Sequence, residues 1–208
     1  LGWGDKVLRL ATPSGERAYP LIHDSRINVA NETGAIAVLS EFGVSGFDAA
    51  LGKVKVTTAR YDEYRIGGLP VVEIAAKSAN PVAVSAVFRQ VAAMPGRKAV
   101  IVAYDDVGEF DVGSENTSWY YDTDFEALND PSLTSILFAG PRHLDAVARA
   151  HIAGVNPALI RSTAVEGEAA AIVDLSGVDQ LLLLRDVYLQ NSAAAIRAGL
   201  RRRLEGKA

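Results

Sequence analysis

Residues 74–81 read Ile74-Ala75-Ala76-Lys77-Ser78-Ala79-Asn80-Pro81 and indicate the fold class, because an apolar strand here passes through a polar turn into the start of a helix. Pro81 suits the first turn of that helix, which we expect to continue to Ala93. The same order then recurs. We expect apolar strands at residues 99–104, 133–139, 158–161 and 180–185, and helices at residues 141–153, 166–175 and 187–204. Apolar strands that alternate with amphipathic helices are typical of a mainly parallel α/β sheet with helices on both faces.

A different pattern precedes this alternation. The turn Thr12-Pro13-Ser14-Gly15 and the pair Gly67-Gly68 predict two hairpins, and Gly43 is expected to end a helix. The elements expected there are strands at residues 7–11, 18–22, 61–66 and 71–76, and helices at residues 26–42 and 47–51. We therefore divide the chain into a hairpin-plus-helix segment, residues 1–44, and an α/β domain, residues 45–208.

Composition narrows the possible functions. The 208 residues are 49% hydrophobic and 22% charged, which is ordinary for a globular protein, and the net charge of −4 gives no global case for nucleic-acid binding. The absence of cysteine excludes disulfides, zinc–thiolate sites and thiol nucleophiles. No apolar run has the length of a membrane span. The chain begins with Leu rather than Met, so we expect a fragment of a longer protein.

Ligands of open α/β sheets bind beyond the carboxyl ends of the strands. At the first such end, Lys77 stands beside a helix amino terminus, whose free N–H groups favour anions. The alternative is a helix-entry loop with a solvated lysine. At the second end, residues 105–126 carry eight carboxylates, no basic residue and the aromatic run Trp119-Tyr120-Tyr121. Crowded carboxylates can orient a histidine or bind magnesium, but a solvated acidic loop anchored by aromatics is an equal alternative.

Other patterns for ligand binding are weak. His23, His143 and His151 share no metal-ligand spacing, so we assign no metal site. Residues 46–53 have one residue too many between their glycines for a phosphate-binding loop, and Val54 stands where Ser or Thr is required.

One longer motif resembles a known family. Thr117-Ser118-Trp119-Tyr120-Tyr121-Asp122-Thr123-Asp124-Phe125-Glu126 resembles the Ser-Trp-x-x-Asp-x-Asp-Phe-Glu signature of MurT proteins. Three weaker similarities occur in the same order along the chain. Residues 27–32 resemble the helix that closes the central domain of Mur ligases, Arg60 resembles the arginine after their hinge, and residues 76–81 resemble the Ala-Lys-Asn-Pro loop of MurT.

This resemblance implies a Rossmann-like Mur-ligase C-terminal domain preceded by the tail of a central domain. The parent enzyme would use ATP and Mg²⁺ to activate the D-glutamate α-carboxylate of lipid II, while a GatD-like glutaminase subunit supplies ammonia. It would be cytoplasmic and would meet the inner face of the membrane through lipid II. Arg60, Lys77 and Asn80 are then expected at the nucleotide. The C-terminal domain is expected to lend an aspartate to a Cys-His-Asp triad of the glutaminase.

The sequence departs from the family at this aspartate. The family segment reads Asp-Gly-Arg-Asp-Val-Ser-Trp, whereas residues 113–119 here place Asn116 where an aspartate is common. We keep Asn116, Asp122 and Asp124 as candidates for the lent residue, with Trp119 packed inward as their anchor. The alternative for Asp122 and Asp124 is that they cap the helix near Phe125.

The missing central domain also limits what this chain does by itself. Because it has no phosphate-binding loop, we expect the chain alone to bind ATP weakly or not at all. The alternative function is a non-catalytic docking module of Mur-ligase descent.

Overall fold

The protein folds into two compact units, Leu1–Thr57 and Thr58–Ala208. The structure is a computed structural model that describes residues 2–12, 15–23, 26–54, 60–104 and 117–206. Our predicted division lies earlier, between residues 44 and 45. The boundary falls later along the chain because Phe47 and Leu51 pack into the core of the first unit.

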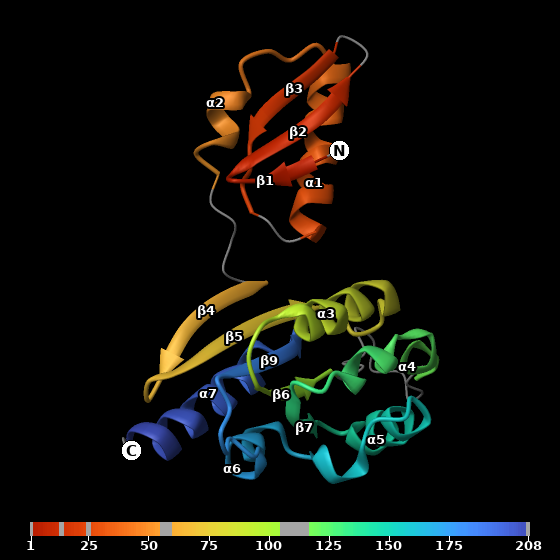
Figure 1. Ribbon diagram of the computed structural model, residues 1–208, viewed down its shortest axis with the longest axis vertical. Helices are drawn as coiled ribbons and strands as arrows, with labels where there is room; N and C mark the ends of the chain where they lie inside the picture. Colours follow the sequence, from red (N-terminus) through yellow and green to blue (C-terminus); the bar gives the residue numbers. More distant parts are fainter. Residues whose placement is uncertain (1, 13–14, 24–25, 55–59, 105–116, 207–208) are drawn as a thin grey trace. The chain divides into compact units, whose positions relative to one another are not determined.

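The first unit pairs a small antiparallel sheet with two helices (Figure 1). Its elements are β1 (Gly2–Gly4), β2 (Val7–Thr12), β3 (Gly15–Pro20), α1 (Arg26–Glu41) and α2 (Asp48–Leu51). The predicted hairpin is present as β2 and β3, and β1 adds a third strand. Tyr19 stacks on Phe47 with ring centroids 5.9 Å apart, which ties α2 to the sheet.

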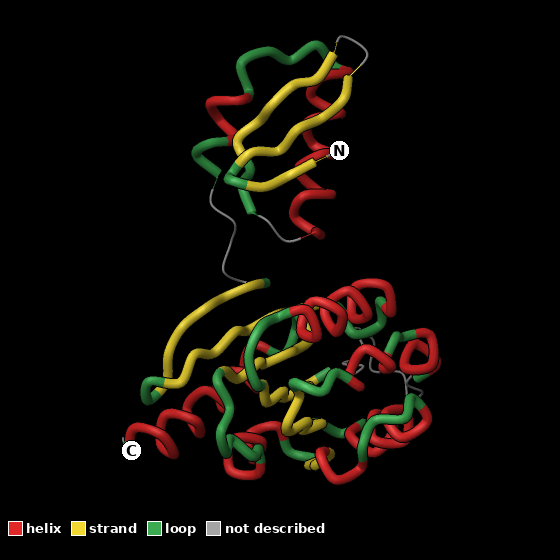
Figure 2. Tube along the Cα trace, viewed as in Figure 1, coloured by secondary structure: helices red, strands yellow, loops and turns green. Residues whose placement is uncertain are grey.

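The second unit is a six-stranded sheet with helices on both faces, as predicted (Figures 1 and 2). Its strands are β4 (Tyr61–Ile66), β5 (Leu69–Ala76), β6 (Lys98–Ala103), β7 (Leu133–Ala139), β8 (Ile160–Thr163) and β9 (Gln180–Asp186). Its α-helices are α3 (Pro81–Ala93), α4 (Ser118–Asp122), α5 (His143–Ile152), α6 (Ala169–Ile172) and α7 (Gln190–Glu205). Three 3₁₀ turns, η1 (Phe125–Asn129), η2 (Pro157–Leu159) and η3 (Glu166–Glu168), complete it. Among the described residues, no helix is long and apolar enough to cross a membrane.

The order of the strands places the last one in the middle. The sheet runs β4-β5-β9-β6-β7-β8, and all neighbours are parallel except β4 and β5. After β5 the chain enters α3, whereas after β9 it enters α7 on the other face. Adjacent strands that send the chain to opposite faces create the crevice in which α/β sheets bind ligands.

The two faces have separate cores. Alternate residues of β9 divide between them, with Leu182 and Leu184 facing α3, α4 and α5, and Leu181 and Leu183 facing α6 and α7. A strand buried on both faces must be apolar throughout, which is why β9 reads as a continuous leucine run.

One glycine in the hairpin of β4 and β5 leaves no room for a side chain without a shift of its neighbours. Gly67 and Gly68 both have positive φ, as a tight two-residue turn requires. A Cβ on Gly67 would lie 2.7 Å from the Cβ of Leu204, and its N–H donates to Glu205 Oε1 at 3.1 Å. Gly67 therefore holds the end of α7 against the edge of the sheet.

Some predicted boundaries differ from the structure. The strand expected at residues 158–161 begins two residues later, because Asn156 caps the turn η2 by accepting a hydrogen bond from Ala158 N. The helix expected at residues 166–175 is the turn η3 followed by the single-turn helix α6.

Candidate functional site

The carboxyl ends of β5 and β9 are joined by one buried carboxylate. Asp186 is 2% exposed, and its Oδ2 accepts hydrogen bonds from the backbone N–H of Ser78 at 2.6 Å and from the Ser78 hydroxyl. Its Oδ1 accepts from Tyr188 N at 2.8 Å. Asp186 thus holds together the two loops that leave the sheet for opposite faces. Sequence reasoning missed it, because an aspartate at the end of a strand is a common residue there.

The three residues predicted to contact a nucleotide are brought to this edge. Lys77 is exposed, with its Nζ 5.7 Å from the centroid of the Tyr188 ring. Asn80 caps α3, since its Oδ1 accepts from Ala83 N at 3.0 Å. Arg60 is exposed, and its carbonyl accepts from Ala75 N at 2.9 Å, which places it beside the end of β5.

The aromatic residues of the signature motif pack inward. Trp119 is 5% exposed and stacks on Tyr120 with ring centroids 4.0 Å apart. The Tyr120 hydroxyl donates to the carbonyl of Tyr104, the residue after β6, at 3.0 Å. The prediction that Trp119 is a buried anchor is confirmed.

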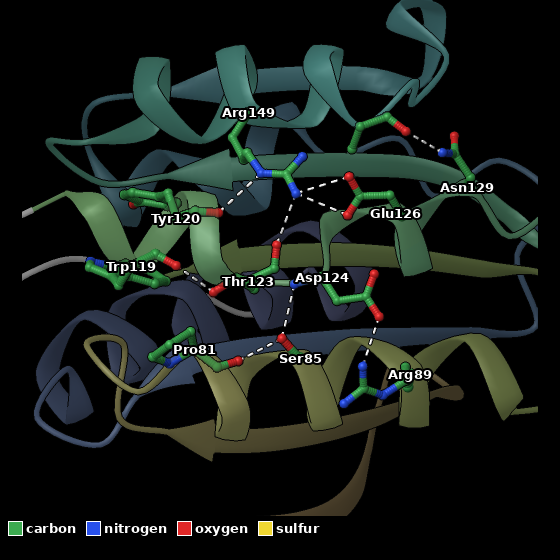
Figure 3. A network of polar contacts seen from close by, with 11 residues as sticks. Pro81, Ser85, Arg89, Trp119, Tyr120, Thr123, Asp124, Glu126, Asn129 and Arg149 are labelled. Carbon is green, nitrogen blue, oxygen red and sulfur yellow. Dashed lines mark hydrogen bonds and ion pairs between the residues drawn. The ribbon is translucent and has the colours of Figure 1, made fainter.

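A buried arginine of α5 holds the motif in place (Figure 3). Arg149 is 6% exposed, and its Nε donates to Tyr120 O at 3.1 Å and its Nη2 to Thr123 O at 3.0 Å. The same Nη2 lies 3.0 and 2.9 Å from the two carboxylate oxygens of Glu126. The guanidinium also lies 5.3 Å from the centroid of the Phe125 ring. The sequence carries no signal for this role, because Arg149 reads as an ordinary basic residue near the end of a helix.

A chain of hydrogen bonds also joins the motif to α3 (Figure 3). Thr123 Oγ1 donates to Trp119 O at 2.7 Å, which closes the turn after α4. Asp124 N donates to the Ser85 hydroxyl at 2.9 Å, and that hydroxyl donates to Pro81 O at 2.6 Å. The motif is therefore held from both sides, by α5 and by α3.

The three predicted catalytic residues have different fates. Asp124 pairs with Arg89 of α3 at 2.8 Å and makes no capping bond to η1, so the capping alternative is wrong for Asp124. Asp122 is exposed and has no hydrogen bond or ion pair with any residue that the structure describes. Asn116 lies outside the described residues. The structure thus brings Asp122 and Asp124 onto one short segment and leaves only Asp122 with an unengaged carboxylate.

Two buried donors lie beside this segment. Within the described part of the chain, neither the Tyr104 hydroxyl nor the Trp119 indole N–H has a hydrogen-bond partner. Burial and the nearby charge of Asp186 raise the pKa of Tyr104 far above its usual value, so its hydroxyl keeps its proton. No three His, Cys, Asp or Glu side chains in the described ranges gather to hold a metal ion.

The family model described as MurT ligase C-terminal matches residues 78–184, which is half of the chain and includes the whole signature motif. A search of curated proteins found no significant match.

Solved Mur ligases share the fold at low sequence identity. MurF from Acinetobacter baumannii is 20% identical with a TM-score of 0.61, covering 92% of this chain and 42% of that chain. MurF from Thermotoga maritima in complex with ADP is 14% identical with a TM-score of 0.60, covering 97% and 45%. MurC from Thermotoga maritima is 12% identical with a TM-score of 0.61, covering 92% and 40%. This chain therefore spans less than half the length of each of these ligases.

Proposed function

This chain belongs to the MurT ligase C-terminal family, and on that premise we propose that it is the C-terminal part of a MurT-like ligase subunit. The whole protein, with a GatD-like glutaminase, would use ATP and glutamine to amidate the D-glutamate α-carboxylate of lipid II in peptidoglycan synthesis. The observation that carries this proposal is the signature motif, which Arg149 and Trp119 hold rigidly while Asp122 stays exposed.

The edge that carries Lys77 and Arg60 is proposed to face the nucleotide. Two cationic side chains beside a helix amino terminus fit the phosphates of ATP, which would supply the phosphoryl group that activates the carboxylate. Lys77 would contact a phosphate. Arg60, the residue immediately before β4, would approach the phosphates from beside the end of β5. Asn80 keeps its carbonyl on Ala83, so only its amide N–H groups are available for a ligand.

Asp122 is the residue proposed to serve the partner subunit. A carboxylate that accepts a hydrogen bond from a catalytic histidine selects its tautomer and stabilises its charged form. For this purpose the carboxylate has to be exposed, unpaired and rigidly held, and Asp122 is exposed and unpaired among the described residues. It lies between two segments that Arg149 fixes, at Tyr120 and Thr123. Asn116 is the competing candidate.

Reconstitution tests this function directly. The full-length protein is mixed with its glutaminase partner, lipid II, ATP and glutamine, and the amidated lipid is detected by mass spectrometry as a mass decrease of about 1 Da, an OH replaced by NH₂. We expect product only when both subunits and ATP are present. Lys77→Ala should lower turnover without preventing assembly, because it removes a phosphate contact. A complex that assembles but never amidates lipid II would favour the alternative, a non-catalytic docking module.

A further inference from the structure

A second polar cluster lies on the other face of the sheet, against α7. Glu73 of β5 is 5% exposed, and its Oε1 accepts from Arg185 Nε at 2.5 Å. Its Oε2 accepts from Arg197 Nη1 at 2.7 Å and from the Tyr64 hydroxyl at 2.9 Å. Burial alone would raise the pKa of Glu73, but the hydrogen bonds from Arg185, Arg197 and Tyr64 outweigh it and lower the pKa. The carboxylate therefore stays charged and holds two guanidinium groups rigidly.

A pocket of about 370 Å³ opens beside this cluster. Its lining consists entirely of polar side chains, namely Asp62, Tyr64, Glu73, Arg185, Arg197 and Arg201. Three guanidinium groups thus meet only two carboxylates. Arg201 lines the pocket and makes no hydrogen bond or ion pair with any described residue, so within that part of the chain its guanidinium donors are available to a ligand.

We propose that this pocket binds the carboxylate or phosphate group of a small polar ligand. Arg197 and Arg201 lie four residues apart on α7, which places both on one side of the helix. Planar guanidinium groups match the oxygens of carboxylates and phosphates, and Glu73 already orders Arg197, which lowers the entropic cost of binding. The volume is within the range of small-molecule sites. Asp62 is the only lining carboxylate without a partner among the described residues. Its charge would repel a ligand that carries more negative charge than the arginines neutralise.

This inference is independent of the proposed function. Glu73, Arg185 and Arg197 belong to the α7 face, whereas Trp119 and Arg149 belong to the face of α3, α4 and α5. Arg185 of this cluster also donates from Nη1 to the carbonyl of Asp186, at the end of β9, at 3.1 Å. Ligand in the pocket would therefore be detected at the neighbouring backbone of β9.

Nuclear magnetic resonance titration of this chain tests the proposal, with inorganic phosphate and acetate as separate probes. We expect backbone amide shifts near Tyr64 and Arg201 that saturate with at least one probe, and the better probe identifies the source of the anion. Arg201→Gln should weaken binding about tenfold, since it removes a charge-assisted contact. Asp62→Asn should tighten binding about threefold, because it removes a repulsive charge.

Arg202→Gln is the matched control, since Arg202 is an exposed arginine of the same helix that does not line the pocket. It should leave binding unchanged. The proposal is overturned if neither probe gives saturable shifts, or if Arg201→Gln and Arg202→Gln weaken binding equally, which would show diffuse attraction to the basic end of α7.

Discussion

Arg149 and Arg185 are both buried arginines of the second unit, but they bind different kinds of partner. Arg149 donates mainly to backbone carbonyls and to a half-exposed carboxylate, so it fixes the shape of one segment. Arg185 meets a buried carboxylate that a second arginine shares, so charge accumulates there and a polar pocket remains. In this protein, therefore, Arg149 stabilises one backbone segment, whereas Arg185 belongs to an ion cluster beside a polar pocket.

Removing Arg149 should have the largest effect on stability. Arg149→Ala leaves the carbonyls of Tyr120 and Thr123 without their donor and opens a cavity beside Phe125. We expect a loss of about 3–5 kcal/mol in the free energy of unfolding, measured by urea denaturation. Arg161→Ala is the control, because the Arg161 side chain is 51% exposed and lies 4.0 Å from its nearest carboxylate. Similar losses for the two variants would show that Arg149 does not frame the motif.

Removing the negative charge of Glu73 should lower the free energy of unfolding by less than Arg149→Ala does. Glu73→Gln leaves Arg185 and Arg197 without their counter-charge but keeps a side chain of the same shape. We expect a loss of about 2–3 kcal/mol in the free energy of unfolding at pH 7, the upper part of the range for a hydrogen bond to a charged group.

The stabilisation by Glu73 should depend on pH. Because the folded pKa of Glu73 is lowered, its stabilisation is fully present above the unfolded value of about 4.5 and is lost as the pH falls through the folded value. The difference between wild type and Glu73→Gln should therefore shrink below pH 4.5. A difference that stays constant down to the acid limit of folding would contradict the lowered pKa.

The exposed pair between Asp124 and Arg89 should matter least. Their side chains are 35% and 57% exposed, and solvent screens such pairs strongly. Asp124→Asn should lower the free energy of unfolding by less than about 1 kcal/mol, as measured by thermal denaturation. A loss as large as that from Glu73→Gln would mean that the pair is part of the frame rather than an accessory to it.

The sheet could be predicted from the sequence, but its strand order could not. Apolar runs such as Leu181–Leu184 indicate strands buried on both faces, since every side chain of such a strand has to be apolar. The insertion of β9 between β5 and β6 depends on long-range pairing, which leaves no local pattern. Lys98 shows a related limit. In the sequence Lys98 marks the residue before the apolar strand, yet in the structure it is buried in β6. Burial is possible because its ammonium group donates hydrogen bonds to the carbonyls of Ala92 and Met94 at the end of α3.

The same limit applies to the candidate site. The inward position of Trp119 could be predicted, because a large aromatic residue in an acidic segment has to find apolar contacts. The partners Arg149 and Ser85 come from helices on either side, and only folding brings them to the motif. The distinction between a paired Asp124 and an exposed Asp122 depends on those partners and therefore needed the structure.

The proposed role of Asp122 is tested by the glutaminase activity of the reconstituted complex after Asp122→Asn. Asp124→Asn is the matched control, and Asn116→Ala tests the competing candidate. Assembly is checked by size-exclusion chromatography. We predict that Asp122→Asn lowers activity by on the order of 10⁴, as loss of the aspartate does in a serine protease triad. Asp124→Asn should change activity little, and both variants should keep their stability. Full activity of an assembled Asp122→Asn complex would show that Asp122 does not serve the partner's histidine.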